Sequence, residues 1–433
     1  MNAPSSTAST VPSALNLRAP LKSLDDALAE LLQNAGVLPE TEQISTFEAD
    51  GRMLAQDVVS ALHVPPVDNS AMDGYAVRCA DVAHLGTLLQ VSQRIAAGAS
   101  GKPLHAQTAA RIFTGAPIPA GADAVLMQED CDVVNGLIGQ GGSQAALGDV
   151  RINAVPKPGQ WIRRAGEDVT KHSVVLRKGE RLTPASLGLA ASIGMNTLAV
   201  ARPPRVALFS TGDELVMPGD VAPQDMKPGA IYNSNRFFLR ALLLRLGCVV
   251  TDFGIVPDKL DATLQALRLA ATDHDLILTS GGVSVGEEDH IKPAVQALGT
   301  LNLWQIAIKP GKPFAYGKIG NAHFMGLPGN PVSSFVTFLL LVRPFLLRLQ
   351  GVADVASKTI ALSAHFTWAR ADKRREFLRV RRNPAGGLDL FANQSSGVLT
   401  SAVWGDGVVD NRPGQTIAHG DMVQFISFAD LLN

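Results

Sequence analysis

Two kinds of hydrophobic pattern alternate along the middle of the chain. Short apolar runs, typical of buried strands, are followed by polar loops and by stretches with helical spacing of apolar residues. Strands are predicted over 205–210, 249–256, 276–279 and 323–327, and helices over 235–246, 260–271 and 332–349. This alternation predicts a three-layer α/β domain with a mostly parallel sheet over residues 201–350.

The flanking segments show other patterns. Residues 53–159 contain short apolar runs, such as 111–114 and 124–127, between glycine, proline and aspartate, which predicts a β-rich inserted domain. Residues 351–433 return to short strands and glycine-rich turns, so we predict a small all-β domain there. Residues 21–34 carry a helical apolar stripe, with Ser23 as the expected N-cap.

Composition limits the class of protein. A chain of 433 residues exceeds what one hydrophobic core fills, so several domains are expected. The net charge of −1 favours neither nucleic acid nor an anionic membrane. The apolar run 335–342 is too short to span a bilayer, which predicts a buried helix. Residues 1–20 lack an apolar segment and predict a disordered lead rather than a signal peptide.

Cysteine and histidine usage excludes several kinds of site. The three cysteines form no C-x-x-C pair, which argues against disulfides or a zinc–thiolate site and suits a reducing cytoplasm. The nine histidines form no HExxH pattern, and no G-x-S-x-G elbow is present. No Walker A loop exists, so a P-loop NTPase is disfavoured, and the dinucleotide-binding glycine fingerprint is missing as well.

Three polar loops follow predicted strands, at 210–215, 280–290 and 326–334. Ligands of such sheets bind at the carboxyl ends of the strands. Gly281 and Gly282 would let backbone N–H groups approach an anion, but the acids at 287–289 would repel it unless a cation lay between. The loops therefore predict a phosphate-bearing ligand with a divalent metal, and oxygen donors favour Mg²⁺. The alternative for any single loop is an ordinary strand-to-helix turn.

Charged segments elsewhere each have two interpretations. The proline-stiffened turn 309–313 holds two lysines suited to phosphate, or it is a solvated surface turn. Segment 65–76 is either functional or an Asx-type turn, and 163–168 is either functional or a solvated turn. The run 373–382 predicts a strand with one charged face, directed either to solvent or to an anion.

Seven of these motifs, taken together and in order, resemble the MoeA-type molybdopterin molybdenumtransferases, which are related to the gephyrin E domain. The motifs lie at 68–75, 114–117, 164–168, 210–214, 280–286, 309–313 and 326–331. The resemblance implies a multidomain α/β plus β fold and an elongated homodimer. It divides the chain into a discontinuous helical dimerisation domain (21–52 and 160–200), a β-rich inserted domain (53–159), a molybdopterin-binding α/β domain (201–350) and a C-terminal β-barrel domain (351–433).

The implied reaction is the Mg²⁺-dependent insertion of molybdate into adenylylated molybdopterin, with release of AMP and molybdenum cofactor. The implied partners are a second copy of the chain, a molybdopterin-adenylylating enzyme and molybdoenzyme chaperones. Two other classes stay open. The α/β domain alone also resembles molybdopterin adenylyltransferases, and a gephyrin-like scaffold is the other alternative.

The resemblance also implies roles for single residues. Acids of the cleft would be Glu214, Asp258 and Asp289, with Glu214 and Asp289 as Mg²⁺ ligands, and Lys309 would contact molybdate or phosphate. The partner subunit would contribute Asp73, Thr114 and Asp168. Further ligand-binding positions are Arg163, Thr211, Gly212, Ser280, Gly281, Gly282, Ser284, Lys312, Pro328, Gly329, Asn330, Pro331 and Ser396. One departure from the family is Gln305, where a second lysine is often found, so one cation is lost.

Overall fold

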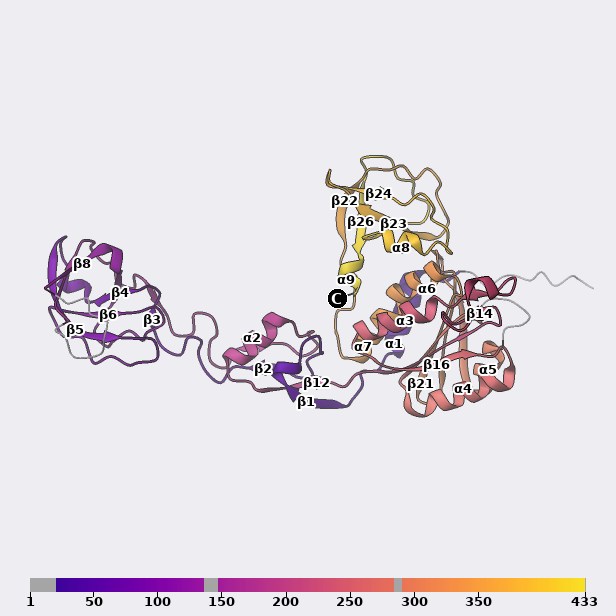
Figure 1. Ribbon diagram of the computed structural model, residues 1–433, viewed down its shortest axis with the longest axis horizontal. Helices are drawn as coiled ribbons and strands as arrows, with labels where there is room; N and C mark the ends of the chain where they lie inside the picture. The colour runs from indigo at the N-terminus through magenta and orange to yellow at the C-terminus, as the bar shows by residue number, and fades with distance from the viewer. Residues whose placement is uncertain (1–20, 136–146, 284–289, 433) are drawn as a thin grey trace, which may run out of the picture. The chain divides into compact units, whose positions relative to one another are not determined.

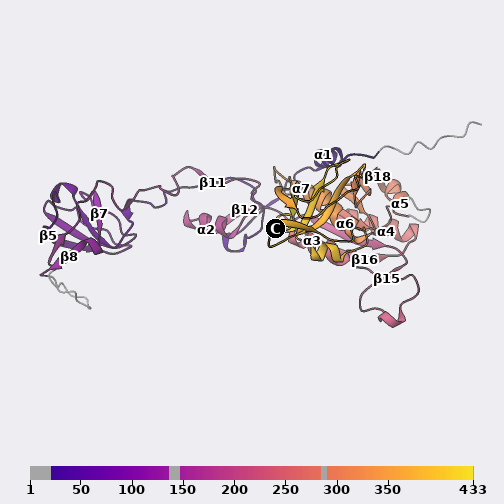
Figure 2. The ribbon, with the colours of Figure 1, turned by 90° about the horizontal axis from the view of Figure 1, so that it is seen from above.

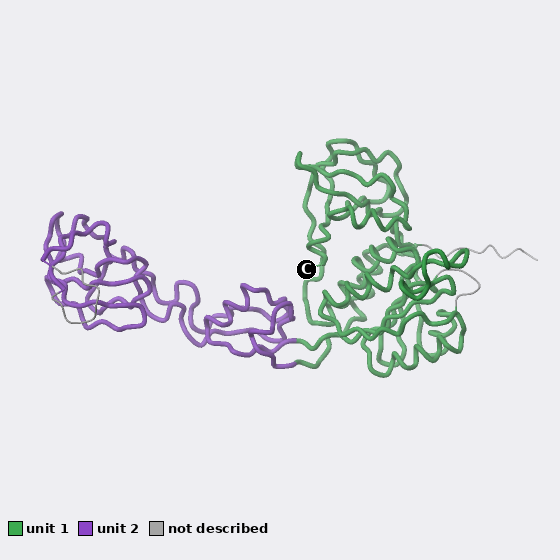
Figure 3. Tube along the Cα trace, viewed as in Figure 1, with its two compact units in different colours: residues 1–41, 201–433 green, residues 42–200 purple. Residues whose placement is uncertain are grey.

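The computed structural model describes residues 21–135, 147–283 and 290–432 (Figures 1 and 2). The chain forms two compact units, coloured separately in Figure 3. Unit 1 combines the described residues up to Thr41 with those from Ala201 onward, and unit 2 comprises Glu42–Val200. Each unit has its own sheets and hydrophobic cores, so each is described by itself.

Unit 1 contains a six-stranded sheet in the order β16-β13-β17-β21-β20-β18. The first four strands are parallel, and β20 and β18 extend the sheet antiparallel. The bounds are β13 Arg205–Thr211, β16 Val249–Val256, β17 Leu276–Ser280, β18 Gly299–Gln305, β20 Pro313–Ile319 and β21 Ala322–Leu327. Every residue of β17 and β21 is buried, which explains their apolar sequences. The predicted, mostly parallel sheet is confirmed.

Helices cover both faces of this sheet, which makes three layers. Figure 1 shows α4 and α5 on one side and α3, α6 and α7 on the other. On the first side, Phe209, Ile277 and Phe324 of the sheet pack with Leu267 of α4 and Val295 of α5. The bounds are α3 Asn235–Arg245, α4 Leu260–Asp273, α5 Ile291–Leu298, α6 Pro331–Thr337 and α7 Arg343–Leu349.

Helices α6 and α7 are joined by the π-helix η5 (Phe338–Val342) into one helical stretch of 19 residues. Pro344 has no N–H to donate to the carbonyl of Leu340, and the π-helical segment lies just before it. The stretch is long and apolar enough to cross a bilayer, but 89% of an apolar window of 18 residues within it is buried inside the protein. It is therefore a core helix, as the sequence predicts.

Helix α1 (Leu24–Asn34) begins after Ser23, whose hydroxyl accepts a hydrogen bond from Asp26 N at 3.0 Å, so the predicted N-cap is confirmed. Its buried residues are Leu24, Ala27 and Leu31, and the helix packs against α7 and η5 of unit 1. This differs from the expectation that 21–52 and 160–200 form one helical domain. The apolar stripe predicts a buried face, but it does not identify the surface that covers it.

The chain leaves unit 1 after Thr41 and returns to it at Ala201. Arg202 N donates to Glu40 O at 3.2 Å, and Arg202 Nε lies 3.1 Å from Glu40 Oε2. The same guanidinium donates to both carboxylate oxygens of Asp275, at 2.7 and 2.9 Å. Asp275 precedes β17, so both crossing segments are fixed to the central strand of the sheet.

Unit 2 is largely β-structure. Its main sheet has the order β7-β4-β6-β5-β9-β8, with bounds β4 Gly74–Val77, β5 Thr87–Ile95, β6 Thr108–Ile112, β7 Ala124–Met127, β8 Cys131–Val134 and β9 Asp149–Ile152. Two-stranded ladders pair β1 (Thr41–Ser45) with β12 (Thr197–Ala201), β2 (Val58–Val59) with β11 (Val174–Leu176), and β3 (Asn69–Ser70) with β10 (Ile162–Arg163). Among its described residues, α2 (Pro184–Ser192) is the one α-helix.

The C-terminal part of unit 1 is a closed five-stranded barrel, since β23 pairs with both β24 and β25. The bounds are β22 Ile360–Ala364, β23 Arg375–Arg382, β24 Gly387–Leu390, β25 Gly407–Asn411 and β26 Met422–Ser427, with helices α8 Thr400–Trp404 and α9 Phe428–Leu432. The short strand β19 (Ile308–Lys309) adds to β23 from outside the ring. The expected C-terminal β-barrel is confirmed.

The charged run that becomes β23 differs from both interpretations of the sequence. Glu376 and Arg379 are each 1% exposed. The Arg379 guanidinium donates to Phe377 O, Ser395 O and Ser401 Oγ, and burial lowers the pKa of Arg379 to about 10. Three residues apart on a strand, these two charged side chains lie on opposite faces of β23, and both are buried, so the run is not a strand with one solvated charged face.

Candidate active site

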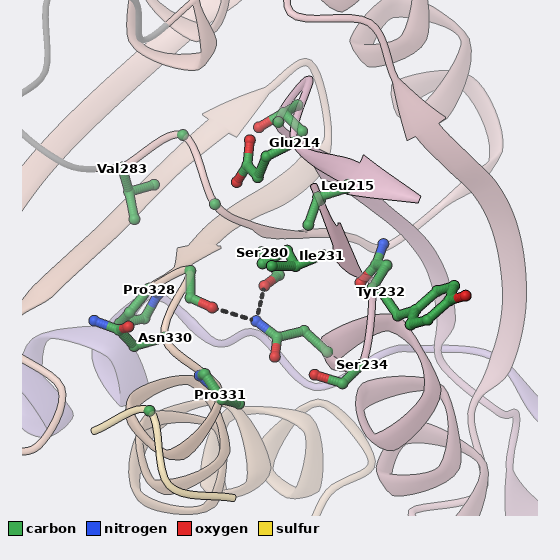
Figure 4. Close-up of a pocket in the computed structure, with 18 of the residues that line it drawn as sticks. Glu214, Leu215, Ile231, Tyr232, Ser234, Ser280, Val283, Pro328, Asn330 and Pro331 are labelled. Carbon is green, nitrogen blue, oxygen red and sulfur yellow. Dashed lines mark hydrogen bonds between the residues drawn. The ribbon is translucent and has the colours of Figure 1, made fainter. Parts of the chain in front are cut away.

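A cavity of about 670 Å³ lies at the carboxyl ends of β13, β17 and β21, beside the first turn of α6. This is the edge where ligands of such sheets bind. Figure 4 shows side chains of the three loops directed toward one another around it. The predicted site residues in its wall are Thr211, Gly212, Glu214, Asp258, Ser280, Gly281, Gly282, Pro328, Gly329, Asn330 and Pro331.

The turn after β17 can only be built from glycine. Gly281 and Gly282 have φ values of +94° and +66°, which side chains rarely adopt. A Cβ on Gly281 would lie 2.8 Å from Thr211 O, and one on Gly282 would lie 2.5 Å from Ile291 Cγ1. The bare backbone therefore forms the cavity wall here, as an anion site requires.

Helix α6 begins at the cavity, with Asn330 as its N-cap and Pro331 in its first turn. Ser334 N donates to Asn330 O at 2.9 Å, which closes the first helical turn. Val332 N donates to Ser396 O at 2.9 Å, so the barrel loop around Ser396 is attached to this helix start. Ser396 is thus held next to the cavity, and its neighbour Gly397 lines it.

Asn235, at the start of α3, connects two of the loops. Its Nδ2 donates to Ser280 Oγ and to Gly329 O, both at 2.7 Å, as the dashed lines in Figure 4 show. The residue is only 8% exposed, so both bonds are shielded from water. The turn after β17 and the turn before α6 are therefore fixed at one separation. Sequence reasoning missed Asn235, because its partners lie 45 and 94 residues away.

The acids Glu214 and Asp258 lie in the wall of the same cavity. The Glu214 carboxylate folds over Gly212, where a Cβ would lie 2.6 Å from Glu214 Oε2. Asp213 Oδ1 accepts a hydrogen bond from Asp258 N at 3.3 Å, which connects the two acidic loops. Asp213 is a second residue that sequence reasoning missed. Asp289 and Ser284 lie outside the described residues.

Three segments of the chain match known protein families. Residues 22–194 match the MoeA N-terminal region (domain I and II), 207–348 a probable molybdopterin binding domain, and 361–428 the MoeA C-terminal region (domain IV). The molybdopterin molybdenumtransferase of Haemophilus influenzae is 44% identical over 328 residues, which is 76% of this chain and 78% of that one.

The chain belongs to the MoeA family. Molybdopterin molybdenumtransferase 2 of Mycobacterium tuberculosis is 36% identical over 377 residues, covering 84% of this chain and 89% of its own. The crystal structure of a molybdopterin biosynthesis MoeA protein from Pyrococcus horikoshii superposes with a TM-score of 0.75. It is 31% identical and covers 94% of this chain and 99% of that one. The predicted multidomain fold is thus the MoeA fold.

In this MoeA-family chain, Lys309 is engaged by two carboxylates of the barrel. Its Nζ lies 2.9 Å from Glu376 Oε1 and 3.2 Å from Asp372 Oδ2. Burial alone would lower the pKa of Lys309, but the hydrogen bonds to Glu376 and Asp372 raise it. The Lys312 side chain forms no hydrogen bond or ion pair with the residues that the structure describes. Neither lysine lines the cavity, although the next residue, Pro313, does.

Within unit 2, residues from different MoeA motifs are bonded to each other in two pairs. Asp73 Oδ1 accepts hydrogen bonds from Thr114 N and Thr114 Oγ1, both at 2.8 Å. The backbone bond and then the hydroxyl bond hold the pKa of Asp73 below its usual value. Arg164 Nη1 lies 2.6 Å from Asp68 Oδ2. The structure therefore brings Asp73 and Thr114 together within unit 2.

The other two predicted residues of unit 2 lie beside the segment that holds Asp68. Arg163 is on β10, where it is the register partner of Asn69 on β3. Asp168 N donates to Val64 O at 3.0 Å. Segments 64–70 and 162–168 therefore lie side by side, although they are about a hundred residues apart.

Proposed function

We propose that this chain is a molybdopterin molybdenumtransferase. It inserts molybdate into adenylylated molybdopterin and releases AMP and molybdenum cofactor. The observation that carries this proposal is the cavity in which a glycine turn, the start of α6 and the acids Glu214 and Asp258 meet in the MoeA fold. Backbone N–H groups suit phosphates, while carboxylates suit a cation that phosphates bind.

The donor set fits Mg²⁺. Glu214 offers carboxylate oxygens at the cavity, and Mg²⁺ is commonly held by one or two carboxylates together with substrate phosphates. Among the described residues no group of three or more His, Cys, Asp or Glu forms a metal cage, which suits a metal completed by phosphate. Glu214 and Asp289 would hold the ion, and its charge would neutralise the pyrophosphate oxygens.

The protein groups need only bind and orient the reactants. The Gly281–Gly282 turn and the Asn330–Pro331 turn hold the phosphates and the pterin. Lys309 and Lys312 precede Pro313 of the cavity wall, and they would supply positive charge near it for molybdate and for the charge that develops when the phosphoanhydride breaks. A molybdate oxygen attacks the adenylate phosphorus, and the phosphoanhydride bond to the molybdopterin phosphate breaks. The two dithiolene sulfurs of molybdopterin then bond to molybdenum, the bond between molybdenum and the attacking oxygen breaks, and that oxygen leaves as part of AMP. No side-chain nucleophile is required.

Asp73, Thr114 and Asp168 belong to unit 2, whereas the cavity belongs to unit 1. We propose that a homodimer completes the site, with these residues from the partner subunit. The solution mass tests the dimer. Mixing Asp73→Asn subunits with Glu214→Gln subunits should restore part of the activity, because some mixed dimers would contain one intact site. No recovery on mixing would contradict a site shared between subunits.

The direct test is turnover with purified protein. AMP should be released only when molybdate, adenylylated molybdopterin and Mg²⁺ are all present, and Glu214→Gln should lower the rate about a hundredfold or more. Consumption of ATP with molybdopterin would indicate an adenylyltransferase and contradict the proposal. Binding of other proteins without turnover would indicate a scaffold.

We also propose that the protein works in the cytoplasm, between an enzyme that adenylylates molybdopterin and chaperones that receive the finished cofactor. The cysteines Cys79, Cys131 and Cys248 are all free thiols, which suits a reducing compartment. Burial raises the pKa of the Cys131 thiol to about 12, so it is a poor nucleophile at neutral pH.

A further inference from the structure

One wall of the cavity is formed by residues 215–232, the segment between β13 and α3, which we call the flap. It contains β14 (Leu215–Val216), the 3₁₀-helix η4 (Pro223–Asp225) and β15 (Ile231–Tyr232). The two strands pair in parallel, and Asn233 N donates to Val216 O at 2.9 Å. Tyr232 Oη donates to Val221 O at 2.7 Å, so the end of the flap is bonded to its middle part. The flap is therefore a hydrogen-bonded wall.

The flap presents an apolar pair to the cavity. Leu215 and Ile231 are register partners, and side chains of paired residues lie on the same face of a sheet. Both line the cavity, and Figure 4 shows them beside Ser280 and Glu214. Ile231 is 55% exposed although it contributes to a concave wall. An apolar side chain exposed there gains free energy when an apolar ligand surface covers it.

Another part of the cavity wall has the complementary chemistry. It consists of the Gly281–Gly282 turn, Gly329 and Asn330 at the start of α6, all suited to phosphate oxygens. Glu214 directly precedes Leu215, so the apolar pair begins one residue, about 3.8 Å along the chain, from the proposed metal-binding acid. The cavity therefore has a polar side for phosphate and an apolar side for a ring.

We propose that Leu215 and Ile231 form the surface on which the planar nitrogen heterocycle of the substrate lies. The inference rests on the proposed function, because that substrate joins two such rings, adenine and pterin, through phosphates. A flat ring covers the exposed Ile231 side chain on one face, while its phosphate reaches the glycine turn. The flap thereby discriminates ring-bearing phosphates from simple phosphates.

Calorimetric binding to the full-length protein tests this with three probes: AMP, 6-hydroxymethylpterin phosphate, and ribose 5-phosphate as the ringless reference. Ile231→Ser should weaken binding of AMP or of the pterin phosphate about tenfold and leave ribose 5-phosphate unchanged. Ile231→Phe should bind the same probe at least as tightly as the unaltered protein, because an aromatic side chain stacks on a flat ring. The probe that responds identifies which ring the flap contacts.

The matched control is Ile360→Ser, since Ile360 is 50% exposed but lies on β22 of the barrel, outside the cavity wall. It should change no affinity. If Ile231→Ser leaves both ring probes unaffected, or weakens ribose 5-phosphate equally, the inference is overturned while measured AMP release keeps the proposed function. If Ile231 controls ring binding but no AMP is released from adenylylated molybdopterin, the inference stands and the proposed function fails.

Discussion

Lys309 and Glu376 connect the α/β domain to the β-barrel by strand pairing and by an ion pair. They are register partners of β19 and β23, and Lys309 Nζ lies 2.9 Å from Glu376 Oε1. Glu376 is 1% exposed, so loss of Lys309 leaves a buried carboxylate whose remaining donors among the described residues are Trp368 and Asn411. Lys309→Met should lower the free energy of unfolding by about 1–2 kcal/mol, a value reduced because the lysine is 41% exposed.

Urea unfolding measures this effect, and Lys312→Met is the matched control. Lys312 lies in the same turn, and its side chain forms no ion pair or hydrogen bond with the described residues. Its loss should therefore change the free energy of unfolding by less than about 0.5 kcal/mol. Equal effects of both substitutions would show that the ion pair does not stabilise the fold. The double variant Lys309→Met, Glu376→Gln should recover part of the loss, because no unpaired charge is left.

Asn235 should affect substrate binding more than chemistry. Asn235→Asp removes a donor shared by Ser280 and Gly329, and it places a carboxylate against a carbonyl oxygen. The two loops would separate, so the KM for adenylylated molybdopterin should rise about tenfold, which corresponds to one buried hydrogen bond. Steady-state kinetics measure this, with Asn302→Asp on the exposed part of β18 as the control. An unchanged KM would mean that Asn235 does not position the loops.

The pKa of Asp73 should depend on the hydrogen bonds that its carboxylate accepts from Thr114. Thr114→Val removes the hydroxyl donor but keeps the backbone donor, so the pKa of Asp73 should rise toward its ordinary value of about 3.8. Thr114→Ser keeps both donors and should leave the pKa low. The carboxyl ¹³C shift followed by NMR against pH measures the midpoint. A midpoint that is the same in both variants would contradict the role of the hydroxyl.

His323 should make the fold less stable in acid. Burial lowers the pKa of His323 from 6.5 to about 4, so the folded state keeps it neutral. The unfolded state takes up the proton first as the pH falls. Stability that is fully present above pH 6.5 is therefore lost progressively toward pH 4, by up to about 3 kcal/mol.

The control for this pH dependence is His323→Gln, which cannot be protonated. Tyr316 Oη lies 2.9 Å from His323 Nδ1, and glutamine can keep a hydrogen bond to that hydroxyl. Urea unfolding at pH 7.5 and pH 4.5 should show a smaller loss for the variant than for the unaltered chain. If both lose the same amount, other groups account for the acid sensitivity.

The sequence predicted the parallel strands well, because their apolar runs can be read without knowing their tertiary partners. The strand 249–256 matches β16 at both ends, and 276–279 differs from β17 by one residue. The site loops followed from the rule that ligands lie after such strands. Their glycines and Glu214 were found because they are adjacent in sequence to a predicted strand.

Other features depend on partners that spacing does not reveal. The stripe of α1 predicts a buried face, but its covering surface, α7, lies about 300 residues further along the chain. Glu376 and Arg379 belong to a charged run that resembles a solvated strand. Their burial is possible because Glu376 accepts a hydrogen bond from Trp368 and Arg379 donates one to Ser401 of α8. Asn235 likewise carries no motif, because its function as a connector exists only after folding.

The hydrogen bond between Arg202 and Glu40 holds together the two ends of the chain segment that forms unit 2. The 159 residues of unit 2 are therefore an insertion that begins and ends at neighbouring points of unit 1. Lengthening or shortening that insertion leaves the backbone of unit 1 in register, since Arg202 stays bonded both to Glu40 and to Asp275. Such an arrangement lets the inserted part diverge in size and surface during evolution, while the ligand-binding core keeps its own folding independence.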